Sequence, residues 1–516
     1  MKKIISTLAL IGTMLASPVL ALEPNYVDCI LGSDSSNGST STPWRTIGYA
    51  LNNVNSSRII RINGLCRERV VLPPNITLEN VLGTMPAIID GKDVGIYPAV
   101  FEIWGQHDIT FKNIKIKNSS NIPGNTVKGI NVLSGKGPDG IWQTADDVGA
   151  YNIKIDGVTF ADINRSSSTI AYSLPLLVSS WGNSQDSLGT AANHISITNN
   201  RFEESDTNSA TINQPLIQIV DNVQDFEIRD NYFKDKDVGA AIQLSGNRST
   251  SAKPNRPTKG VIINNVSEQM GQSGVWITAA QKILIQDNFF VSSSRGVNVY
   301  TENQGLYGDF DIAKQIWVRK NTFKDLTYQA LATGAIWSSE YCDVADVYFT
   351  NNYIMNKSKP NGSEAISLYG DHARDAGETE SCLTTCGQVT GECGDLIGDS
   401  KIVNNIVYSD TPTHTNARLL LSAVDFNAEP GVVINKNFWG APSTSLPFVN
   451  GGTFLDFNGW RAVSGQGALD RYRDWTSDYS FTPSFAWFRL NREPKPTWLV
   501  GQDFFGAYTP VEINNL

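Results

Sequence analysis

The residues that could act as acids, bases and charge neutralisers follow three short apolar runs, at 297–299, 335–337 and 366–368. They are Glu302 after the first run, Glu340 after the second, and Tyr369, Asp371, His372 and Arg374 at the end of the third. Elimination from a uronic acid needs a cation beside the carboxylate and a base that removes the C5 proton. Arg374 or Arg248 would supply the cation, and His372 or Tyr369 the base.

Hydrolysis of a glycosidic bond is the alternative reaction for the same cluster. It needs two carboxyl groups on opposite sides of the bond, for which Glu302, Glu340 and Asp371 are the candidates. His372 stands out because the chain has only four histidines and because histidine titrates near neutral pH. The residue types therefore allow both reactions.

Aromatic and amide side chains occupy the strand positions next to these groups. If Val275, Val297 and Ile366 point into a core, their neighbours point outward. The outward and adjoining positions carry Gln218, Gln243, Trp276, Asn298, Tyr300 and Ser367, with Trp337 and Arg248 close by. Sugar rings stack on aromatic faces, and their hydroxyls need fixed polar partners. We expect Gln243, Arg248, Trp276, Asn298, Tyr300 and Trp337 to line a glycan cleft. Alternatively, the long segments after Glu302 and Asp371 cover the aromatic rings.

A repeated phrase along the chain indicates which elements position these residues. It consists of an alternating apolar run, an Asn, an aromatic or apolar residue and a polar turn, with Asn at 200, 231, 265, 288, 321 and 352. The spacings of 23 to 34 residues are those of parallel β-helix coils with inserted loops. One copy cannot bury its apolar face alone, so the copies must stack. We predict that these Asn side chains form one turn column, where Asn tolerates a left-handed backbone and bonds to its neighbours.

The two ends of the chain differ from the repeats. Residues 1–21 combine Lys2 and Lys3 with a short apolar stretch and small residues before position 22, which predicts a secretory signal peptide; an uncleaved anchor is the alternative. Residues 22–100 are expected to form an N-terminal cap and the first coils, and residues 101–440 the β-helix repeats. The aromatic-rich segment 441–516 is expected to cap the C-terminal end, with a carbohydrate-binding module as the alternative.

Charge and cysteine usage restrict the partners and the compartment. A net charge of -10 gives no general basic surface for nucleic acid, although a local basic groove is compatible with it. No apolar run after the leader is long enough to span a bilayer. Six cysteines in an exported chain favour disulfides. We expect Cys29 to pair with Cys66, and Cys342, Cys382, Cys386 and Cys393 to pair among themselves; a zinc site formed by these four is the alternative.

An acidic loop at residues 137–147 provides one candidate metal site. It carries Asp139, Asp146 and Asp147 beside a Gly turn, the ligand types that Ca²⁺ prefers. A solvated acidic turn explains the same residues. Calcium is thus the one cofactor that the sequence suggests.

Three parts of the chain resemble a known group of proteins. They are the opening Gly32-Ser-Asp34 and Pro43-Trp-Arg-Thr-Ile47, the Asn-aromatic repeats, and the ending with Trp460, Gly465-Gln466 and Gly506-Ala-Tyr508. The mature chain resembles the secreted right-handed parallel β-helix proteins of the pectate-lyase-like superfamily. The resemblance implies an all-β, single-stranded right-handed parallel β-helix solenoid with an N-terminal cap helix and an irregular, aromatic-rich C-terminal segment. It also implies a polysaccharide as the partner, since most characterised members act on one.

Diagnostic patterns of polygalacturonases, pectin esterases and pectate lyases are missing, and Tyr369 to Arg374 is only loosely similar to the catalytic cluster of alginate epimerases and lyases. We favour an exported lyase acting on an acidic polysaccharide. The alternatives are a glycoside hydrolase with a carboxylate pair and a non-catalytic glycan-binding or adhesion protein.

Overall fold

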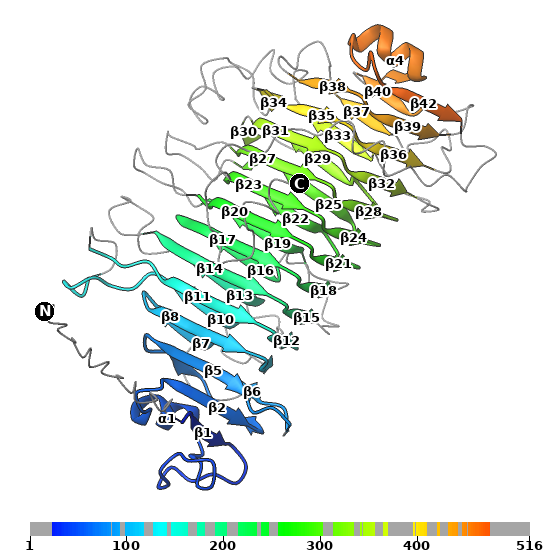
Figure 1. Cartoon of the computed structure of the whole chain (residues 1–516). Coiled ribbons are helices and arrows are strands. Elements are labelled where there is room, and N and C mark those ends of the chain that lie inside the picture. Colours follow the sequence, from blue (N-terminus) through cyan, green and yellow to red (C-terminus); the bar gives the residue numbers. More distant parts are fainter. Residues whose placement is uncertain are drawn as a thin grey trace, which may run out of the picture.

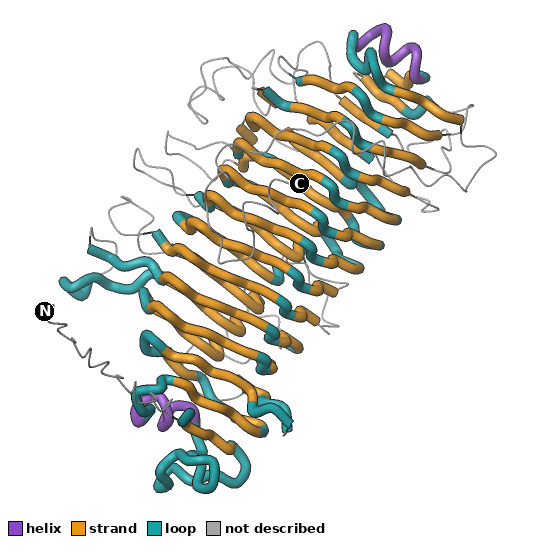
Figure 2. Tube along the Cα trace, in the orientation of Figure 1, coloured by secondary structure: helices purple, strands orange, loops and turns teal. Residues whose placement is uncertain are grey.

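The computed structural model describes residues 23–83, 85–92, 99–117, 127–141, 146–163, 173–180, 191–203, 215–234, 239–246, 256–302, 313–334, 341–342, 344–356, 365–369, 396–397, 399–409, 420–423, 432–441, 446–450 and 453–474. These residues form an elongated body in which strands lie across the long axis (Figure 1). Strands make up most of this body (Figure 2), and a short helix lies at each end of the described residues.

Three long sheets run along the body. Sheet A contains the strands before each Asn turn: β1 (Asn25–Asp28), β2 (Ile59–Asn63), β5 (Ile76–Asn80), β8 (His107–Lys112), β11 (Tyr151–Asp156), β14 (Ala192–Thr198), β17 (Val223–Arg229), β20 (Thr258–Ile263), β23 (Gln281–Gln286), β27 (Lys314–Arg319), β31 (Val344–Thr350), β35 (Lys401–Val403) and β38 (Val433–Asn435), with β34 (Leu396–Ile397) beside β31.

Sheet B contains the strands after each Asn turn: β3 (Leu65–Cys66), β6 (Ile88–Asp90), β9 (Lys115–Lys117), β12 (Thr159–Ala161), β15 (Arg201–Glu203), β18 (Tyr232–Lys234), β21 (Val266–Glu268), β24 (Phe289–Val291), β28 (Thr322–Lys324), β32 (Tyr353–Asn356), β36 (Ile406–Ser409), β39 (Phe438–Ala441) and β42 (Arg471–Asp474).

Sheet C closes each coil: β4 (Val70–Val71), β7 (Ala99–Trp104), β10 (Val127–Leu133), β13 (Ser173–Ser179), β16 (Ile217–Val220), β19 (Ala240–Ser245), β22 (Ser273–Ile277), β25 (Arg295–Val299), β29 (Leu331–Gly334), β33 (Ile366–Tyr369), β37 (Leu421–Ala423), β40 (Phe448–Asn450) and β41 (Thr453–Leu455). Apart from the β40–β41 pair, the neighbours in the three sheets pair in parallel. The chain passes from A to B to C and back to A, one coil further along the axis. The protein is a right-handed parallel β-helix, as predicted.

The predicted Asn column is confirmed and continues for two further coils. Asn288 illustrates its geometry: its Nδ2 donates to Asn321 Oδ1 at 3.0 Å and to the Ile262 carbonyl oxygen at 2.9 Å, and its Oδ1 accepts from Asn265 N and Nδ2, each at 2.9 Å. The same pattern continues through Asn405 to Asn437.

One detail of the turn differs from the sequence expectation. The left-handed residue is the one before each buried Asn, as in Asp230 at φ 57° and Asp287 at φ 54°, and not the Asn itself. The corner residue is exposed or half-buried in most coils, but Asn351 and Asn404 are buried. The Asn that follows is buried in every coil of the column and uses its amide to satisfy backbone groups inside the turn.

Inward-facing side chains form continuous columns within the coil. Phe160 stacks on Phe202 with ring centroids 4.6 Å apart, and Phe202 stacks on Phe233 at 5.0 Å. All three rings are fully buried, and burial of each contributes roughly 1.5–3 kcal/mol. This core forces the intervening side chains to face outward, and so fixes which residues each outer face presents.

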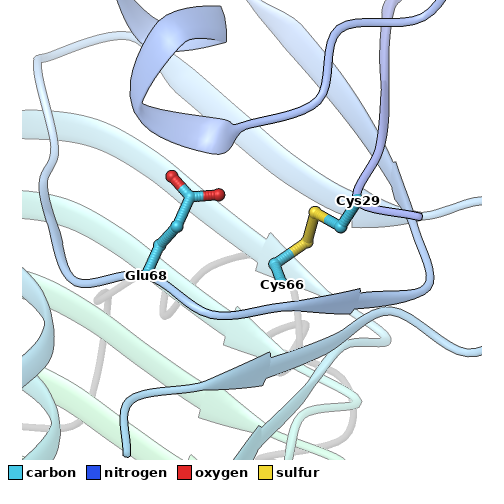
Figure 3. Close-up of side chains that lie close together, drawn as sticks. All are labelled: Cys29, Cys66 and Glu68. Carbon is cyan, nitrogen blue, oxygen red and sulfur yellow. A yellow bond between two sulfur atoms is a disulfide. The ribbon is translucent and has the colours of Figure 1, made fainter. Parts of the chain in front are cut away.

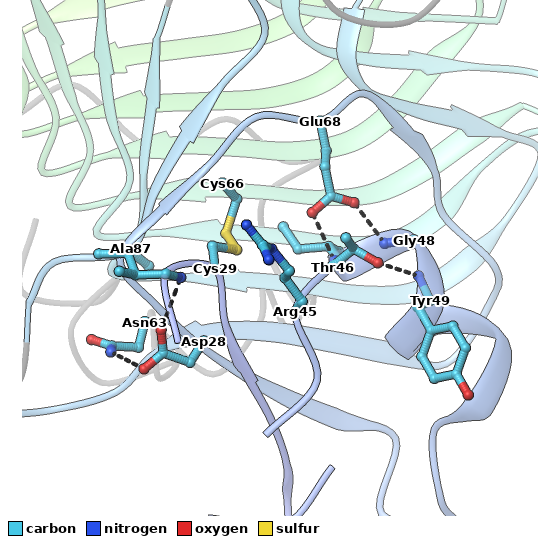
Figure 4. The surroundings of a disulfide bond; sticks show 12 residues. Asp28, Cys29, Arg45, Thr46, Gly48, Tyr49, Asn63, Cys66, Glu68 and Ala87 are labelled. Carbon is cyan, nitrogen blue, oxygen red and sulfur yellow. Dashed lines mark hydrogen bonds between the residues drawn. A yellow bond between two sulfur atoms is a disulfide. The ribbon is translucent and has the colours of Figure 1, made fainter. Parts of the chain in front are cut away.

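Helix α1 (Ile47–Asn53) covers the N-terminal end. Its N-cap Thr46 accepts a hydrogen bond from Tyr49 N at 3.2 Å, and the carboxylate of Glu68 accepts from Ile47 N and Gly48 N at 2.8 and 2.9 Å. The expected disulfide between Cys29 and Cys66 is present beside this cap (Figure 4). Of the other four cysteines, Cys342 is described only by its main chain, and Cys382, Cys386 and Cys393 lie outside the described residues.

Helix α4 (Phe457–Ser464) covers the C-terminal end. Trp460 packs on Phe448 at 4.9 Å and on Trp439 at 6.1 Å, which closes the core. The sequence from 475 to 516 lies outside the described residues. Neither described helix combines the length and the apolar character that crossing a membrane requires.

Candidate functional site

The outer face of sheet C carries the column of amide and aromatic residues that was predicted from the sequence. Strand pairing places Gln218 beside Gln243, Gln243 beside Trp276, and Trp276 beside Asn298. Ala332 and then Ser367 continue the column. Because six successive parallel strands hold these six residues, each residue lies about 4.8 Å from the next along the axis.

Contacts within this column join amides to aromatic rings. Gln218 Nε2 donates to Gln243 Oε1 at 3.2 Å, and the ring of Trp276 lies 5.9 Å from that of Tyr300 at an interplanar angle of 57°. Gln243 and Trp276 are half-buried. Asn298 and Tyr300 are 2 % and 6 % exposed, so neither presents an open surface to solvent in this structure.

Two polar atoms of the column lack a hydrogen-bond partner among the described residues. They are the donor Trp276 Nε1 and the acceptor Asn298 Oδ1, one coil apart on the same face. Both atoms are buried, so leaving each unpaired costs about 1–3 kcal/mol and neither atom faces solvent in this structure.

A buried polar cluster at the first coils was not predicted from the sequence. Asn131 Nδ2 donates to Glu102 Oε2 at 2.6 Å, Trp104 Nε1 donates to the same oxygen at 3.1 Å, and Lys128 Nζ donates to Asn131 Oδ1 at 3.1 Å. Burial raises the pKa of Glu102 and lowers the pKa of Lys128. Since Glu102 is held by three donors, Ala99 N included, it acts here as a fixed polar anchor of the face.

Asp221 is the second group on this side of the molecule that the sequence analysis missed. It follows β16 in a left-handed turn at φ 66°, and its Oδ2 accepts a hydrogen bond from Ser179 Oγ at 2.6 Å. Its Oδ1 has no hydrogen-bond partner among the described residues. Burial raises the pKa of Asp221 from its ordinary value of 3.8 to about 6.

We expect Asp221 to make stability fall as the pH rises from about 4 to about 6. The folded state holds this proton more tightly than the unfolded state, so ionisation costs about 3 kcal/mol of stability above that window. Asp221→Asn should therefore match the wild type near pH 4 and gain in melting temperature relative to it by pH 7. Asp287→Asn, at an exposed turn, serves as the control. A difference between Asp221→Asn and wild type that stays constant with pH would contradict this.

The structure brings together the main chains that follow two of the predicted strand ends. Glu302 in β26 (Thr301–Glu302) pairs antiparallel with Tyr341 in β30 (Tyr341–Cys342). Tyr369 ends β33 and pairs with Gly334. For Glu302 and Tyr369 only the main chain is described. Arg248, Trp337, Glu340, Asp371, His372 and Arg374 lie outside the described residues, so their roles stay predictions.

An antiparallel bridge between Gly135 and Val148 joins the two ends of the acidic loop. Asp139 Oδ1 accepts from Ile141 N at 2.7 Å, and Asp146 Oδ2 accepts from Asp139 N at 3.0 Å. Asp147 Oδ1 accepts from Gly137 N at 3.3 Å. The carboxylates thus lie on one loop, where calcium remains a prediction.

Cys29, Cys66 and Glu68 are the one group of three potential ligand residues whose donor atoms lie close together among the described residues (Figure 3). Both sulfur atoms form the disulfide, and the carboxylate of Glu68 accepts hydrogen bonds from the first two backbone N–H groups of α1. This group is therefore structural.

Comparison with known proteins finds no matching family model, and no curated protein matches. Solved structures do match. The surface adhesin PfbA of Streptococcus pneumoniae is 17% identical over 77% of this chain and 84% of its own, with a TM-score of 0.48. A Yersinia enterocolitica family 28 exopolygalacturonase is 11% identical over 87% and 78%, with a TM-score of 0.46. The tailspike of E. coli bacteriophage HK620 is 11% identical over 82% and 65%, with a TM-score of 0.48. At these identities the similarity concerns the fold.

Proposed function

We propose that this protein is an exported polysaccharide lyase that binds an acidic glycan on the outer face of sheet C. The observation that carries the proposal is the column Gln218, Gln243, Trp276 and Asn298, in which three amide side chains and one indole ring share one face. The Cys29–Cys66 disulfide supports export, because such bonds persist in oxidising compartments.

The chemical step assigned to the site is β-elimination. Arg374 or Arg248 neutralises the uronate carboxylate, which makes the C5 proton more acidic. His372 or Tyr369 removes that proton, the electron pair forms a C4–C5 double bond, and the O4 leaving group departs with a proton from a tyrosine. The products are one chain that ends in an unsaturated uronate and a second chain with a newly exposed reducing end.

Spacing argues against the described carboxyl groups as a hydrolytic pair. Glu102 in β7 and Asp221 after β16 are separated by three coils, about 14 Å along the axis. Glycosidases hold their two carboxyl groups about 5–9.5 Å apart. A hydrolase would therefore need Glu302, Glu340 or Asp371, and these remain the basis of the alternative hypothesis.

A panel of polysaccharides tests the proposal. The purified protein is incubated with polygalacturonate, alginate and neutral hydroxyethylcellulose, and reducing ends are measured together with the ultraviolet absorbance of an unsaturated uronate. We expect both signals to rise on an acidic polymer. Reducing ends without absorbance indicate the hydrolase, and binding without either signal indicates the adhesion protein. Absence of both binding and products on every acidic polymer contradicts the proposal. A parallel assay after chelation tests Asp139, Asp146 and Asp147 as calcium ligands.

A further inference from the structure

A column of aromatic residues runs along the outer face of sheet B. Strand pairing aligns Tyr232, Phe289, Tyr353 and Phe438 on this face, each separated from the next by one coil. Val266, Thr322 and Ile406 occupy the intervening coils. We call these seven residues the sheet B ladder. Their neighbours Phe233, Phe290 and Ile354 point into the core, which fixes the outward orientation of the ladder.

Outer faces of the three sheets differ in how open they are. Val261 and Leu284 on sheet A, and Asn298 and Ala332 on sheet C, are all buried although they face away from the core. On sheet B the ladder stays half-exposed at six of its seven positions, and only Ile406 is buried. Half-buried aromatic rings also lie on the outer faces of sheet A, at Trp317 and Tyr348, and of sheet C, at Trp276. The sheet B ladder differs from these in spreading four rings over seven successive coils.

The ladder has a regular period that suits a linear polymer. An aromatic ring recurs every second coil, about 9.6 Å along the axis, and a β-branched residue separates each pair of rings. This distance is about the length of two linked sugar rings. Aromatic rings in such a row can stack on alternate residues of an extended glycan.

Polar contacts hold the first ring of the ladder in place. The guanidinium of Arg201 lies 4.5 Å from the centroid of the Tyr232 ring, and the Tyr232 hydroxyl donates to Glu268 Oε2 at 2.6 Å. Lys234 Nζ lies 3.5 Å from Glu268 Oε1. Burial and Glu268 raise the pKa of Tyr232 to about 12, so this hydroxyl keeps its proton at neutral pH. Charged groups therefore flank the ladder in fixed positions.

The charge of this face is opposite to that of the whole chain. Among outward positions of sheet B with described side chains, the basic residues are Lys115, Lys117, Arg201, Lys234, Lys324 and Arg471. The acidic residues are Asp90, Glu203 and Glu268. Six basic and three acidic groups give the whole outer face of sheet B a charge of +3, whereas the chain carries -10. The coils of the ladder itself contribute Lys234, Lys324 and Glu268, a net charge of +1. A basic face on an acidic protein attracts a polyanion selectively.

We infer that the sheet B ladder binds an acidic polysaccharide that runs along the axis of the β-helix. This surface is separate from sheet C and would hold the polymer while the site on sheet C acts on it. The inference takes the acidic glycan from the proposed function, but it requires no cleavage.

Affinity electrophoresis in gels containing polygalacturonate, alginate or neutral hydroxyethylcellulose tests the inference. The ladder variant combines Phe289→Ala with Tyr353→Ala. A second variant with Leu at both positions keeps the apolar bulk and removes only the flat rings, so that loss of folding cannot explain its effect. The control combines Tyr49→Ala with Tyr151→Ala, two exposed tyrosines outside the ladder. Lys324→Glu tests the charge.

We expect both ladder variants to raise the dissociation constant for an acidic polymer about tenfold or more, and the control variant to leave it unchanged. Lys324→Glu should weaken binding of acidic polymers alone. The inference is wrong if the wild type binds neither acidic gel, or if the ladder variants bind as the wild type does. A wild-type dimer in sedimentation that the ladder variants dissociate would instead assign the face to a second copy of this chain. Cleavage of a short oligosaccharide should be unaffected in the ladder variants, which separates this result from failure of the site on sheet C.

Discussion

Asn288→Ala should destabilise the β-helix by several kcal/mol, far more than the loss of an exposed asparagine. The substitution removes the Oδ1 that accepts from Asn265 N and Nδ2, and the Nδ2 that donates to the Ile262 carbonyl and to Asn321 Oδ1. Each buried group left without a partner costs about 1–3 kcal/mol, and at least three groups are affected. Chemical denaturation monitored by circular dichroism measures the loss.

Asn53→Ala provides the control for this prediction. Asn53 is exposed at the end of α1, where alanine is a good helix former, so a change of less than about 0.5 kcal/mol is expected. Equal stability of the Asn288→Ala variant and the wild type would show that the amide column does not hold the coils together. The effect should be similar for Asn265 and Asn321, which make the same bonds.

His372→Ala or Arg374→Ala should lower turnover of the cleaved polysaccharide about a hundredfold or more. The first change removes the proposed base and the second the proposed cation beside the uronate. Neither residue belongs to the repeats that build the core, so the melting temperature should stay nearly unchanged. Initial rates of double-bond formation and thermal melts of the same preparations test both statements.

Asp375→Ala is the matched control, because it removes a charge from the same segment but from no assigned group. Glu302→Gln and Glu340→Gln distinguish the two reactions. A loss confined to these carboxyl variants would favour hydrolysis. Full activity in all four variants at His372, Arg374, Glu302 and Glu340 would place the chemistry on another face.

The coil architecture could be predicted because its signal recurs. Each copy repeats the apolar alternation and the buried Asn, and stacking is the only way to bury such short strands. The same alternation predicts that Gln218, Gln243, Trp276 and Asn298 share one outward column, and the strand pairing confirms it. Register thus follows from local pattern alone.

Other features depend on contacts between distant residues. Glu102 is a single acid within an apolar run. Its hydrogen-bond partner Asn131 lies beside it in the next coil, and Lys128 in turn donates to Asn131. The repeated phrase is weak in these first coils, so the sequence does not reveal this pairing. The left-handed residue before each Asn varies among Asp, Asn and Lys, so its type carries no clear signal. Burial of Asn298 and Tyr300 was not predictable, because an outward strand position does not reveal whether other parts of the chain cover it.

The sheet B ladder could be predicted from the sequence only in part. Its aromatic residues are visible in the sequence directly after the Asn of several repeats, as at Tyr232 and Phe289. Which residue of each pair faces out depends on the turn geometry, and the openness of the face depends on the whole molecule. The structure was therefore needed to show that these regularly spaced aromatic residues form one half-exposed face.

Binding of a short acidic oligosaccharide to Trp276→Ala and Trp317→Ala variants tests the central claim most directly. Trp276 and Trp317 are both half-buried, outward-facing tryptophans on neighbouring sheets, so they match in size and setting. If the outer face of sheet C is the glycan site, Trp276→Ala raises the dissociation constant about tenfold and Trp317→Ala leaves it within about twofold. Unchanged binding by Trp276→Ala, or an equal loss in both variants, would contradict the account.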